Sequence, residues 1–201
     1  MLRGYREDRE TMHEVRLHGR GGQGAVLASA ILAAALVEEG RHVMAIPAFG
    51  FERRGAPVVA FLRLSDTVIR RVTNIYSPDI VVVIDPTVVR AVDVYAGMPK
   101  GGTLILATSK VPGEIEVPPV VERVAVCNAI TIAMDIFKRQ ITNTIMLGAF
   151  AKATGLVSVD SLEKALEETH FRDAGLKQNI EAVRRGYAET QILDLAKEKV
   201  A

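Results

Sequence analysis

The segment that most restricts the fold of this chain is a glycine-rich turn, HGRGGQG, at residues 18–24. A short stretch of β-prone residues, VRL, precedes it, and a 13-residue apolar run from Ala25 to Val37 follows it. The glycines at positions 19, 21 and 24 match the spacing G-x-G-x-x-G. A strand, a glycine turn and a helix in this order are typical of the first βα unit of a Rossmann-like domain, where the turn lies at the carboxyl end of the strand.

The rest of the chain continues the alternation of strands and helices. Strands are expected at 42–46, 80–84, 103–107 and 120–126, together with a hairpin of strands 57–64 and 67–72 around Ser65–Asp66. The pattern becomes helical from Asn128, with a last helix at about 176–199. We therefore predict an α/β fold: a single three-layer Rossmann-like domain with a mainly parallel sheet, a β-hairpin edge and a helical C-terminal third. Residues 1–12 are expected to form an N-terminal arm, and residues 13–201 the domain.

The composition excludes several classes of protein. The formal net charge is +1 and the arginines occur in scattered pairs, so we expect no nucleic-acid partner. The single cysteine, Cys127, excludes an internal disulfide and a four-cysteine iron–sulfur cluster, and the histidine spacing predicts no metal site. The first residues lack the apolar core of a signal peptide, and the apolar run is too short to span a bilayer. We therefore expect a cytoplasmic protein with no membrane partner.

The glycine turn alone leaves three interpretations open. A dinucleotide-binding domain also requires an acidic residue at the end of the second strand to hold the ribose hydroxyls. That strand ends in Ala45-Ile46-Pro47-Ala48-Phe49, which contains no acid. The turn therefore indicates a free-standing NAD(P)- or flavin-dependent oxidoreductase, a binding module that takes no nucleotide, or a turn that serves only close packing.

Four segments together resemble the gamma subunit of 2-oxoacid:ferredoxin oxidoreductases, of which pyruvate synthase is one. They are HGRGGQG, AFGFERRGAPVVAFLRLSD, PDIVVVID and NTIMLGAFAKATGL, in this order between Val15 and Gly155. A later helix ending in RRGY at Tyr187 is also similar. The tripeptide Gly55-Ala56-Pro57 is similar to the branches of this family that use pyruvate and branched-chain oxoacids.

This resemblance implies an activity that belongs to a complex. Such complexes convert a 2-oxoacid, coenzyme A and oxidised ferredoxin to an acyl-CoA, carbon dioxide and reduced ferredoxin. The resemblance assigns thiamine diphosphate, Mg²⁺ and the [4Fe–4S] clusters to the alpha, beta and delta subunits. The residues agree with this division, because the chain has no G-D-G motif and only one cysteine. We expect the isolated chain to be inactive and to bind no cofactor.

The candidate site consists of the glycine turn and two arginines after the second strand. In a parallel sheet, the loop that follows residues 42–46 lies at the same carboxyl edge as the glycine turn. This edge should face either coenzyme A, whose phosphates suit arginine, or another subunit, and we favour the subunit interface. The residues are Gly19, Gly21, Gly22, Gln23, Gly24, Arg53 and Arg54.

Three other residues are assigned structural roles. Asp85 precedes Pro86 and should cap a helix that begins there. His18 is interpreted as a structural histidine, and Cys127 as a small buried side chain rather than a nucleophile. The sequence assigns no catalytic residue to this chain.

Overall fold

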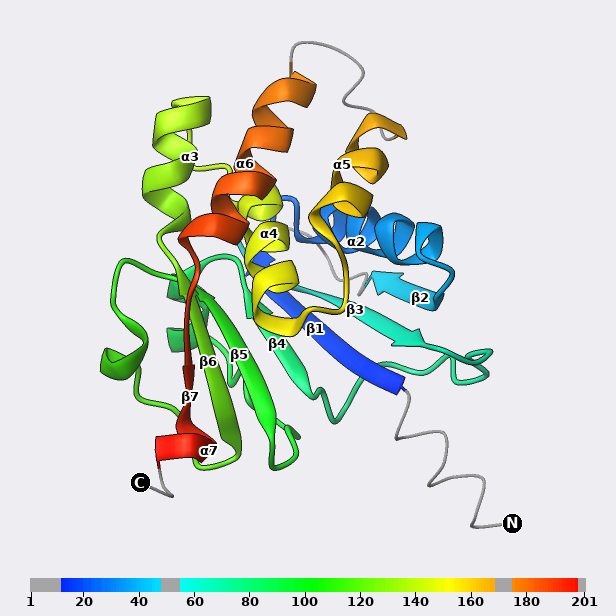
Figure 1. The fold of residues 1–201 in the computed structure, drawn as a ribbon. Helices are drawn as coiled ribbons and strands as arrows, with labels where there is room; N and C mark the ends of the chain where they lie inside the picture. Colours follow the sequence, from blue (N-terminus) through cyan, green and yellow to red (C-terminus); the bar gives the residue numbers. More distant parts are fainter. Residues whose placement is uncertain (1–11, 48–54, 169–174, 199–201) are drawn as a thin grey trace.

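A seven-stranded mixed sheet with helices α2 to α6 on one face forms the framework of the described residues (Figure 1). The computed structural model describes residues 12–47, 55–168 and 175–198. The strands, in the spatial order β2-β3-β1-β4-β5-β6-β7, are β1 (Met12–Arg20), β2 (His42–Pro47), β3 (Pro57–Ser65), β4 (Ile80–Val83), β5 (Gly102–Ala107), β6 (Val121–Cys127) and β7 (Gln191–Asp194). The helices are α2 (Ala25–Glu38), α3 (Ala129–Phe137), α4 (Asn143–Thr154), α5 (Val159–Glu168), α6 (Gly175–Glu189) and α7 (Leu195–Glu198). Two short 3₁₀ helices are η1 (Pro86–Arg90) and η2 (Pro112–Glu114).

The centre of the sheet, β1-β4-β5-β6, is parallel, as the sequence predicts. Every residue of β4, with the sequence IVVV, is buried, because covering layers lie on both faces of this strand. The backbone N–H of Ile84 donates to the carbonyl of His18 at 2.8 Å. The ends of β1 and β4 therefore meet, which brings the glycine turn and Asp85 to one edge of the sheet.

The antiparallel edge of the sheet is a hairpin, although not the predicted one. β3 runs antiparallel to both β1 and β2, so that Leu62 pairs with Val15 on one side and with Ala45 on the other. Residues 67–72, predicted as the partner of β3, have no regular structure. Because β1 and β2 already satisfy both sides of β3, no free edge remains for a third neighbour.

The helical face is built around α4, which α6 crosses at very short range. A Cβ atom added to Gly148 would lie 2.0 Å from the carbonyl oxygen of Val183. One added to Gly186 would lie 2.0 Å from the carbonyl oxygen of Ile145. Glycine at both positions therefore allows the two backbones to touch. Within the described residues, no helix is long and apolar enough to cross a membrane.

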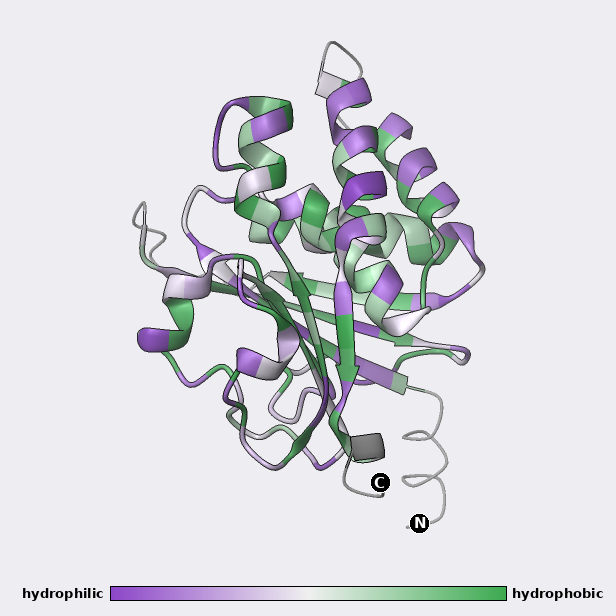
Figure 2. Cartoon of the chain, turned by 60° about the vertical axis from the view of Figure 1, so that its left-hand side comes forward, coloured by the Kyte–Doolittle hydropathy of each residue, from purple (hydrophilic) through white to green (hydrophobic). Residues whose placement is uncertain are grey.

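The opposite face of the sheet is covered by η1, η2 and irregular chain. Val83, Leu104 and Val124 pack there against Val94 and Met98. Figure 2 shows the central strands as mainly hydrophobic, in keeping with burial on both faces. The predicted third layer is therefore present, although it consists of 3₁₀ turns and loops instead of long helices.

The C-terminal third carries the helices α3, α4, α5 and α6, and after Glu189 the chain returns to the sheet. The predicted last helix at 176–199 is wrong beyond Glu189, because Gln191–Asp194 forms β7, antiparallel to β6. The Thr190 hydroxyl donates to the carbonyl of Gly186 at 2.6 Å and closes the end of α6. Pairing with β6 supplies hydrogen bonds that outweigh the local helical preference of these residues.

Candidate functional site

The glycine turn connects β1 to α2 at the carboxyl edge of the sheet. Gly22 and Gly24 have positive φ angles of 90° and 75°, a backbone conformation that side chains with a Cβ rarely adopt. A Cβ atom on Gly19 would lie 3.3 Å from that of Ala25, tighter than ordinary packing. Most of the glycine pattern is therefore required by the shape of the turn itself.

The third glycine of the pattern also makes room for α4. A Cβ atom on Gly24 would lie 2.5 Å from Nδ2 of Asn143, the first residue of α4. Asn143 is only 4% exposed, and its Oδ1 has no hydrogen-bond partner among the described residues. Next to it, the Thr142 hydroxyl donates to the carbonyl of Ile84 at 3.2 Å. The start of α4 is thus packed between the ends of β1 and β4, which the sequence analysis did not foresee.

The backbone donors of the turn are largely used within the protein. Gly21 N–H donates to the carbonyl of Ala56 at 2.9 Å, and Gly55 N–H donates to the carbonyl of Gly21 at 3.1 Å. Gln23 N–H donates to the carbonyl of Arg20 at 3.0 Å, while its Oε1 accepts from Arg20 N–H at 2.9 Å. In a dinucleotide site such N–H groups point at the pyrophosphate. Those of Arg20, Gly21 and Gln23 are already bonded within the protein here, which argues against that use of the turn.

Side chains of the turn form a network with the end of β4. Arg20 Nε donates to the Thr87 hydroxyl at 2.7 Å, and its Nη1 donates to the carbonyl of Gly55 at 2.8 Å. Gln23 Nε2 donates to Asp85 Oδ2 at 2.5 Å. Arg20 and Thr87 were not singled out from the sequence, because only the fold brings them together. The network holds the turn, η1 and the start of β3 in one arrangement.

Asp85 has the capping role that the sequence predicts. Its Oδ1 accepts from the N–H of Thr87 at 2.8 Å, and Pro86 occupies the first position of η1. Burial by itself would raise the pKa of Asp85. Hydrogen bonds from Thr87 and Gln23 and the charge of Arg20 outweigh this effect, so the pKa lies below its ordinary value. Asp85 is therefore a stable carboxylate, suited to fixing the turn and unsuited to proton transfer near neutral pH.

A hollow of about 540 Å³ lies beside the turn at the start of α2. Its lining residues are Arg20, Gly21, Gly22, Gly24, Ala25, Val26, Leu27, Ala30 and Val58. The N–H groups of the first turn of α2 have no acceptor within the helix, so this end of the hollow attracts negative charge. The remaining wall is apolar. Such a hollow suits a ligand or partner that combines an anionic and an apolar part.

The loop with the two predicted arginines leaves β2 at Pro47 and returns to the glycine turn at Gly55. Pro47 pairs with Ala60, which in turn pairs with Leu17 of β1, and Gly55 is bonded to the turn. The described ends of the loop, Pro47 and Gly55, therefore lie on the side of the sheet where β1 ends. Arg53 and Arg54 themselves lie outside the described residues, so their placement stays a prediction.

His18 is a buried structural histidine, as predicted. Its Nε2 accepts from Nε of Arg16 at 3.1 Å. Burial, followed by the charge of Arg16, lowers the pKa of His18 to about 4. Arg16 also donates to the carbonyls of Val94 and Ala96 at 2.8 and 3.0 Å, which ties the irregular layer to β1. His18 is thus neutral near pH 7, and it accepts a hydrogen bond from the arginine that ties the irregular layer to the sheet.

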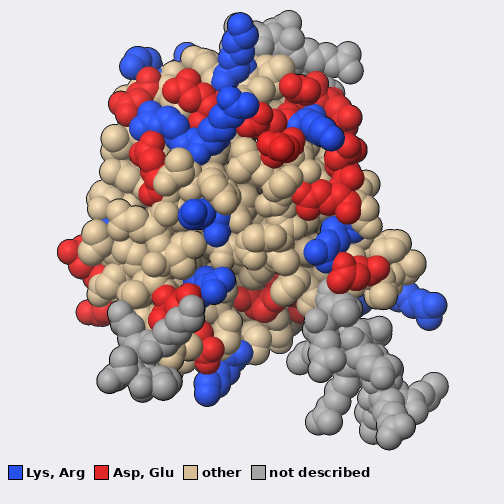
Figure 3. All heavy atoms as spheres, viewed as in Figure 1, with Lys and Arg blue, Asp and Glu red and all other residues tan. Residues whose placement is uncertain are grey.

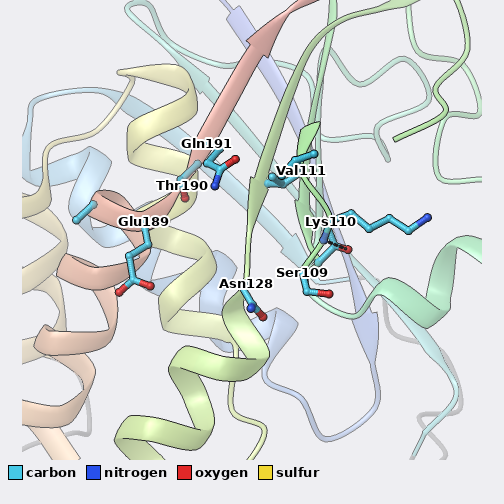
Figure 4. A pocket seen from close by; sticks show the side chains of 10 residues that line it. Ser109, Lys110, Val111, Asn128, Glu189, Thr190 and Gln191 are labelled. Carbon is cyan, nitrogen blue, oxygen red and sulfur yellow. Dashed lines mark hydrogen bonds between the residues drawn. The ribbon is translucent and has the colours of Figure 1, made fainter. Parts of the chain in front are cut away.

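A second hollow, of about 440 Å³, lies at the ends of β5 and β6 (Figure 4). Asn128 caps α3 there, Lys110 extends away from it, and Glu189 is bonded to Arg185 at 2.6 Å. Cys127, at the end of β6, is buried, and burial raises its pKa to about 11. Its interpretation as an inert side chain is supported. The described residues contain no group of three potential metal ligands.

Charged side chains on the face shown in Figure 3 gather over α5 and α6 in both signs. Arg184 forms a two-point ion pair with Glu163 at 2.6 and 2.7 Å. Lys164 lies 3.4 Å from Glu38. Nucleic-acid surfaces instead gather charge of one sign, so these ion pairs belong to the solvated surface of the helices.

Comparisons with known proteins agree on one family. Residues 14–189 match the family model described as pyruvate ferredoxin/flavodoxin oxidoreductase. The chain is 60% identical over 181 residues to the NADH-dependent phenylglyoxylate dehydrogenase subunit gamma of Aromatoleum evansii, covering 90% of this chain and 95% of that one. It is 48% identical over 186 residues to the pyruvate/ketoisovalerate oxidoreductases common subunit gamma of Pyrococcus furiosus, covering 92% of this chain and all of that one.

A solved structure has the same fold. The pyruvate oxidoreductase subunit PORC of Thermotoga maritima superimposes with a TM-score of 0.79 at 37% identity. The match covers 92% of this chain and 99% of that chain. The α/β fold predicted from the sequence is therefore confirmed both within this molecule and by comparison.

Proposed function

This chain belongs to the pyruvate ferredoxin/flavodoxin oxidoreductase family, and from that premise we propose that it is the gamma subunit of a cytoplasmic complex that oxidises pyruvate with coenzyme A and ferredoxin. The observation that carries the proposal is the similarity to gamma subunits over 95% or more of their length. Within such a complex this chain is a non-catalytic component.

The division of labour follows from the chemistry of the residues present. Thiamine diphosphate supplies the carbanion chemistry of oxidative decarboxylation, and [4Fe–4S] clusters carry the electrons to ferredoxin. A cluster requires several thiolates, whereas the one cysteine of this chain is buried with a raised pKa. Alpha, beta and delta subunits would therefore hold thiamine diphosphate, Mg²⁺ and the clusters, while this chain shapes the surface around them.

Gly55-Ala56-Pro57 resembles the branches of the family that use pyruvate and branched-chain oxoacids, and of these we propose pyruvate. Phenylglyoxylate is the second candidate, because the relative from Aromatoleum evansii is 60% identical to this chain. The relative from Pyrococcus furiosus is named a subunit common to pyruvate and ketoisovalerate enzymes. A gamma chain shared by two activities supports placing the choice of oxoacid in the other subunits.

The free-standing NAD(P) or flavin enzyme is set aside for two reasons. The backbone N–H groups of Gly21 and Gln23 already donate hydrogen bonds to carbonyls within the protein. The second strand lacks the terminal acid that a dinucleotide ribose requires.

The glycine-turn edge is proposed as the surface that this chain turns toward the rest of the complex. Its apolar hollow and the helix start of α2 suit a partner subunit, and the anionic phosphates of coenzyme A are the alternative ligand. Arg53 and Arg54 would lie on the same edge.

Purification of the chain with its native partners tests the proposal. We expect brown, cluster-bearing chains to accompany it and to reduce an electron-accepting dye with pyruvate and coenzyme A. Faster turnover of phenylglyoxylate would select the second candidate. A lone chain carrying one equivalent of a dinucleotide would contradict both.

Replacing Arg53 or Arg54 with Ala in the assembled complex separates the two roles of the edge. Loss of one charge-assisted contact to coenzyme A should raise its KM by about 10- to 150-fold and leave the KM of the oxoacid unchanged. Loss of assembly would instead identify an interface, the role that we favour. Unchanged kinetics in a fully assembled complex would exclude both roles for these arginines.

A further inference from the structure

Residues 66–77, between β3 and β4, expose apolar side chains to an unusual degree. Val68, Val72 and Tyr76 are 66%, 72% and 74% exposed, the highest values of any large hydrophobic residue in the described part of the chain. The segment has no regular secondary structure. An exposed apolar group of this kind marks an interaction surface more often than it marks free surface.

The inner side of this segment is held firmly by one arginine of β3. Arg63 is 1% exposed, and it donates to the carbonyls of Arg71, Thr73 and Asn74 at 3.0, 2.5 and 3.1 Å. Its Nε donates to Glu14 at 2.7 Å, which supplies the opposite charge. Three carbonyls fixed by one buried guanidinium give the irregular segment a defined shape.

A buried isoleucine adds a second anchor. Ile75 is buried while its neighbour Tyr76 points outward. At the far end, Asp79 N–H donates to the carbonyl of Glu14 at 3.0 Å. The apolar side chains are therefore presented on a fixed support, which reduces the entropy lost when a partner binds.

Hollows flank the exposed residues, and the charge beside them is positive. One, of about 630 Å³, is lined by Met12, Val68 and Arg70 among others, and another, of about 370 Å³, includes Tyr76. Asp66 is already paired with Arg41. Arg70 is exposed and has no partner among the described residues, so a partner with carboxylates beside an apolar surface would complement this segment.

We propose that residues 66–77 form a docking surface for another subunit of the same oxidoreductase, through an apolar patch on that subunit flanked by carboxylates. This inference rests on the proposed function. The gamma subunits of Aromatoleum evansii and Pyrococcus furiosus are matched over 95% and 100% of their length, so the exposed apolar side chains and Arg70, unpaired among the described residues, indicate a partner subunit as the occupant. Met12, at the start of β1, lines one hollow, whereas the glycine turn follows the end of β1. The surface is thus separate from the glycine-turn edge.

Substitutions in the assembled complex test this surface. Each of Val72→Asp, Tyr76→Ser and Arg70→Glu is co-expressed with the other subunits, and the dissociation constant of this chain is measured in the purified complex. We expect the first two to raise it about 10-fold or more and Arg70→Glu to raise it as well. Val37→Asp is the matched control, because Val37 is 58% exposed at the end of α2 and should leave the constant unchanged.

The outcomes distinguish the inference from the proposed function. If the Val72→Asp and Tyr76→Ser chains stay bound as tightly as the unsubstituted chain, residues 66–77 are not a docking surface, and the proposed function stands. If the isolated chain is a dimer that Val72→Asp disperses, the occupant is a second copy and the inference is wrong. If the unsubstituted chain does not assemble with subunits that oxidise a 2-oxoacid, the proposed function is wrong, and the inference that rests on it is wrong as well.

Discussion

Two buried arginines, Arg63 and Arg16, fix the irregular parts of this molecule. Arg63 has Glu14 as its opposite charge, whereas Arg16 donates to carbonyls and to a neutral histidine. Both use the planar fork of the guanidinium to satisfy several carbonyls of irregular chain at once. Single residues of β1 and β3 therefore hold segments that have no hydrogen-bond ladder of their own.

Replacing Arg63 with Ala should destabilise the protein strongly. The change leaves Glu14 without its closest opposite charge and frees three carbonyls, so the free energy of unfolding should fall by about 3–5 kcal/mol. Urea denaturation measures this loss. Arg184→Ala, which removes an exposed ion pair with Glu163, is the control and should change the free energy of unfolding far less. Equal effects of the two changes would contradict the anchoring role of Arg63.

His18 should make the protein sensitive to acid. Its pKa is about 4 in the folded chain and 6.5 in the unfolded chain, so protonation favours the unfolded state between these values. Its contribution is complete above pH 6.5 and is lost as the pH falls toward 4, by at most about 3 kcal/mol. His13 acts in the opposite direction, because the hydrogen bond that its Nδ1 donates to Asp79 raises its pKa, so its contribution is present below pH 6.5 and is lost at higher pH. The free energy of unfolding, measured between pH 4 and 7, should depend less steeply on pH in His18→Gln than in the unsubstituted chain. A pKa of His18 near 6.5 in the folded protein would refute the assignment.

At the scale of helices and strands, the sequence predicts the elements that local signals mark, but it does not predict pairings between distant segments. The apolar run and Gly40 correctly predict α2 and its end, because both signals lie within the helix and its C-terminal turn. The sequence pattern predicts helix for β7, because its partner β6 lies far away in the sequence. The same limit applies to the site. The glycine turn is visible in the sequence, whereas its contacts with Thr87 and Asn143 exist only in the folded chain.

The contact between α4 and α6 depends on glycine at two positions. Gly148→Ala would place a Cβ atom 2.0 Å from the carbonyl of Val183, so the helices must separate. We expect a loss of about 1–3 kcal/mol or more, as for other overpacked cores. Thermal unfolding measures it, with Gly113→Ala as control, since nothing lies within 4 Å of a Cβ atom there. A melting temperature unchanged by Gly148→Ala would contradict the observed helix contact.

At the scale of the whole molecule, the described residues fit the proposed role of this chain as a non-catalytic subunit. Three of its titratable groups, His18, Asp85 and Cys127, have pKa values shifted away from neutrality, which suits fixed structure and not proton transfer. The glycine-turn edge and residues 66–77 lie toward opposite ends of β1. Such a chain can bridge neighbours in a complex from two sides.

Reconstitution of the complex tests this account most directly. The rate of coenzyme A-dependent oxidation of the 2-oxoacid is measured for the pure isolated chain, for the other subunits without it, and for the mixture. The account predicts no turnover by the isolated chain, a deficient rate without it, and recovery that saturates at one equivalent per gamma site. Turnover by the pure chain alone, or full activity of the other subunits in its absence, would contradict it.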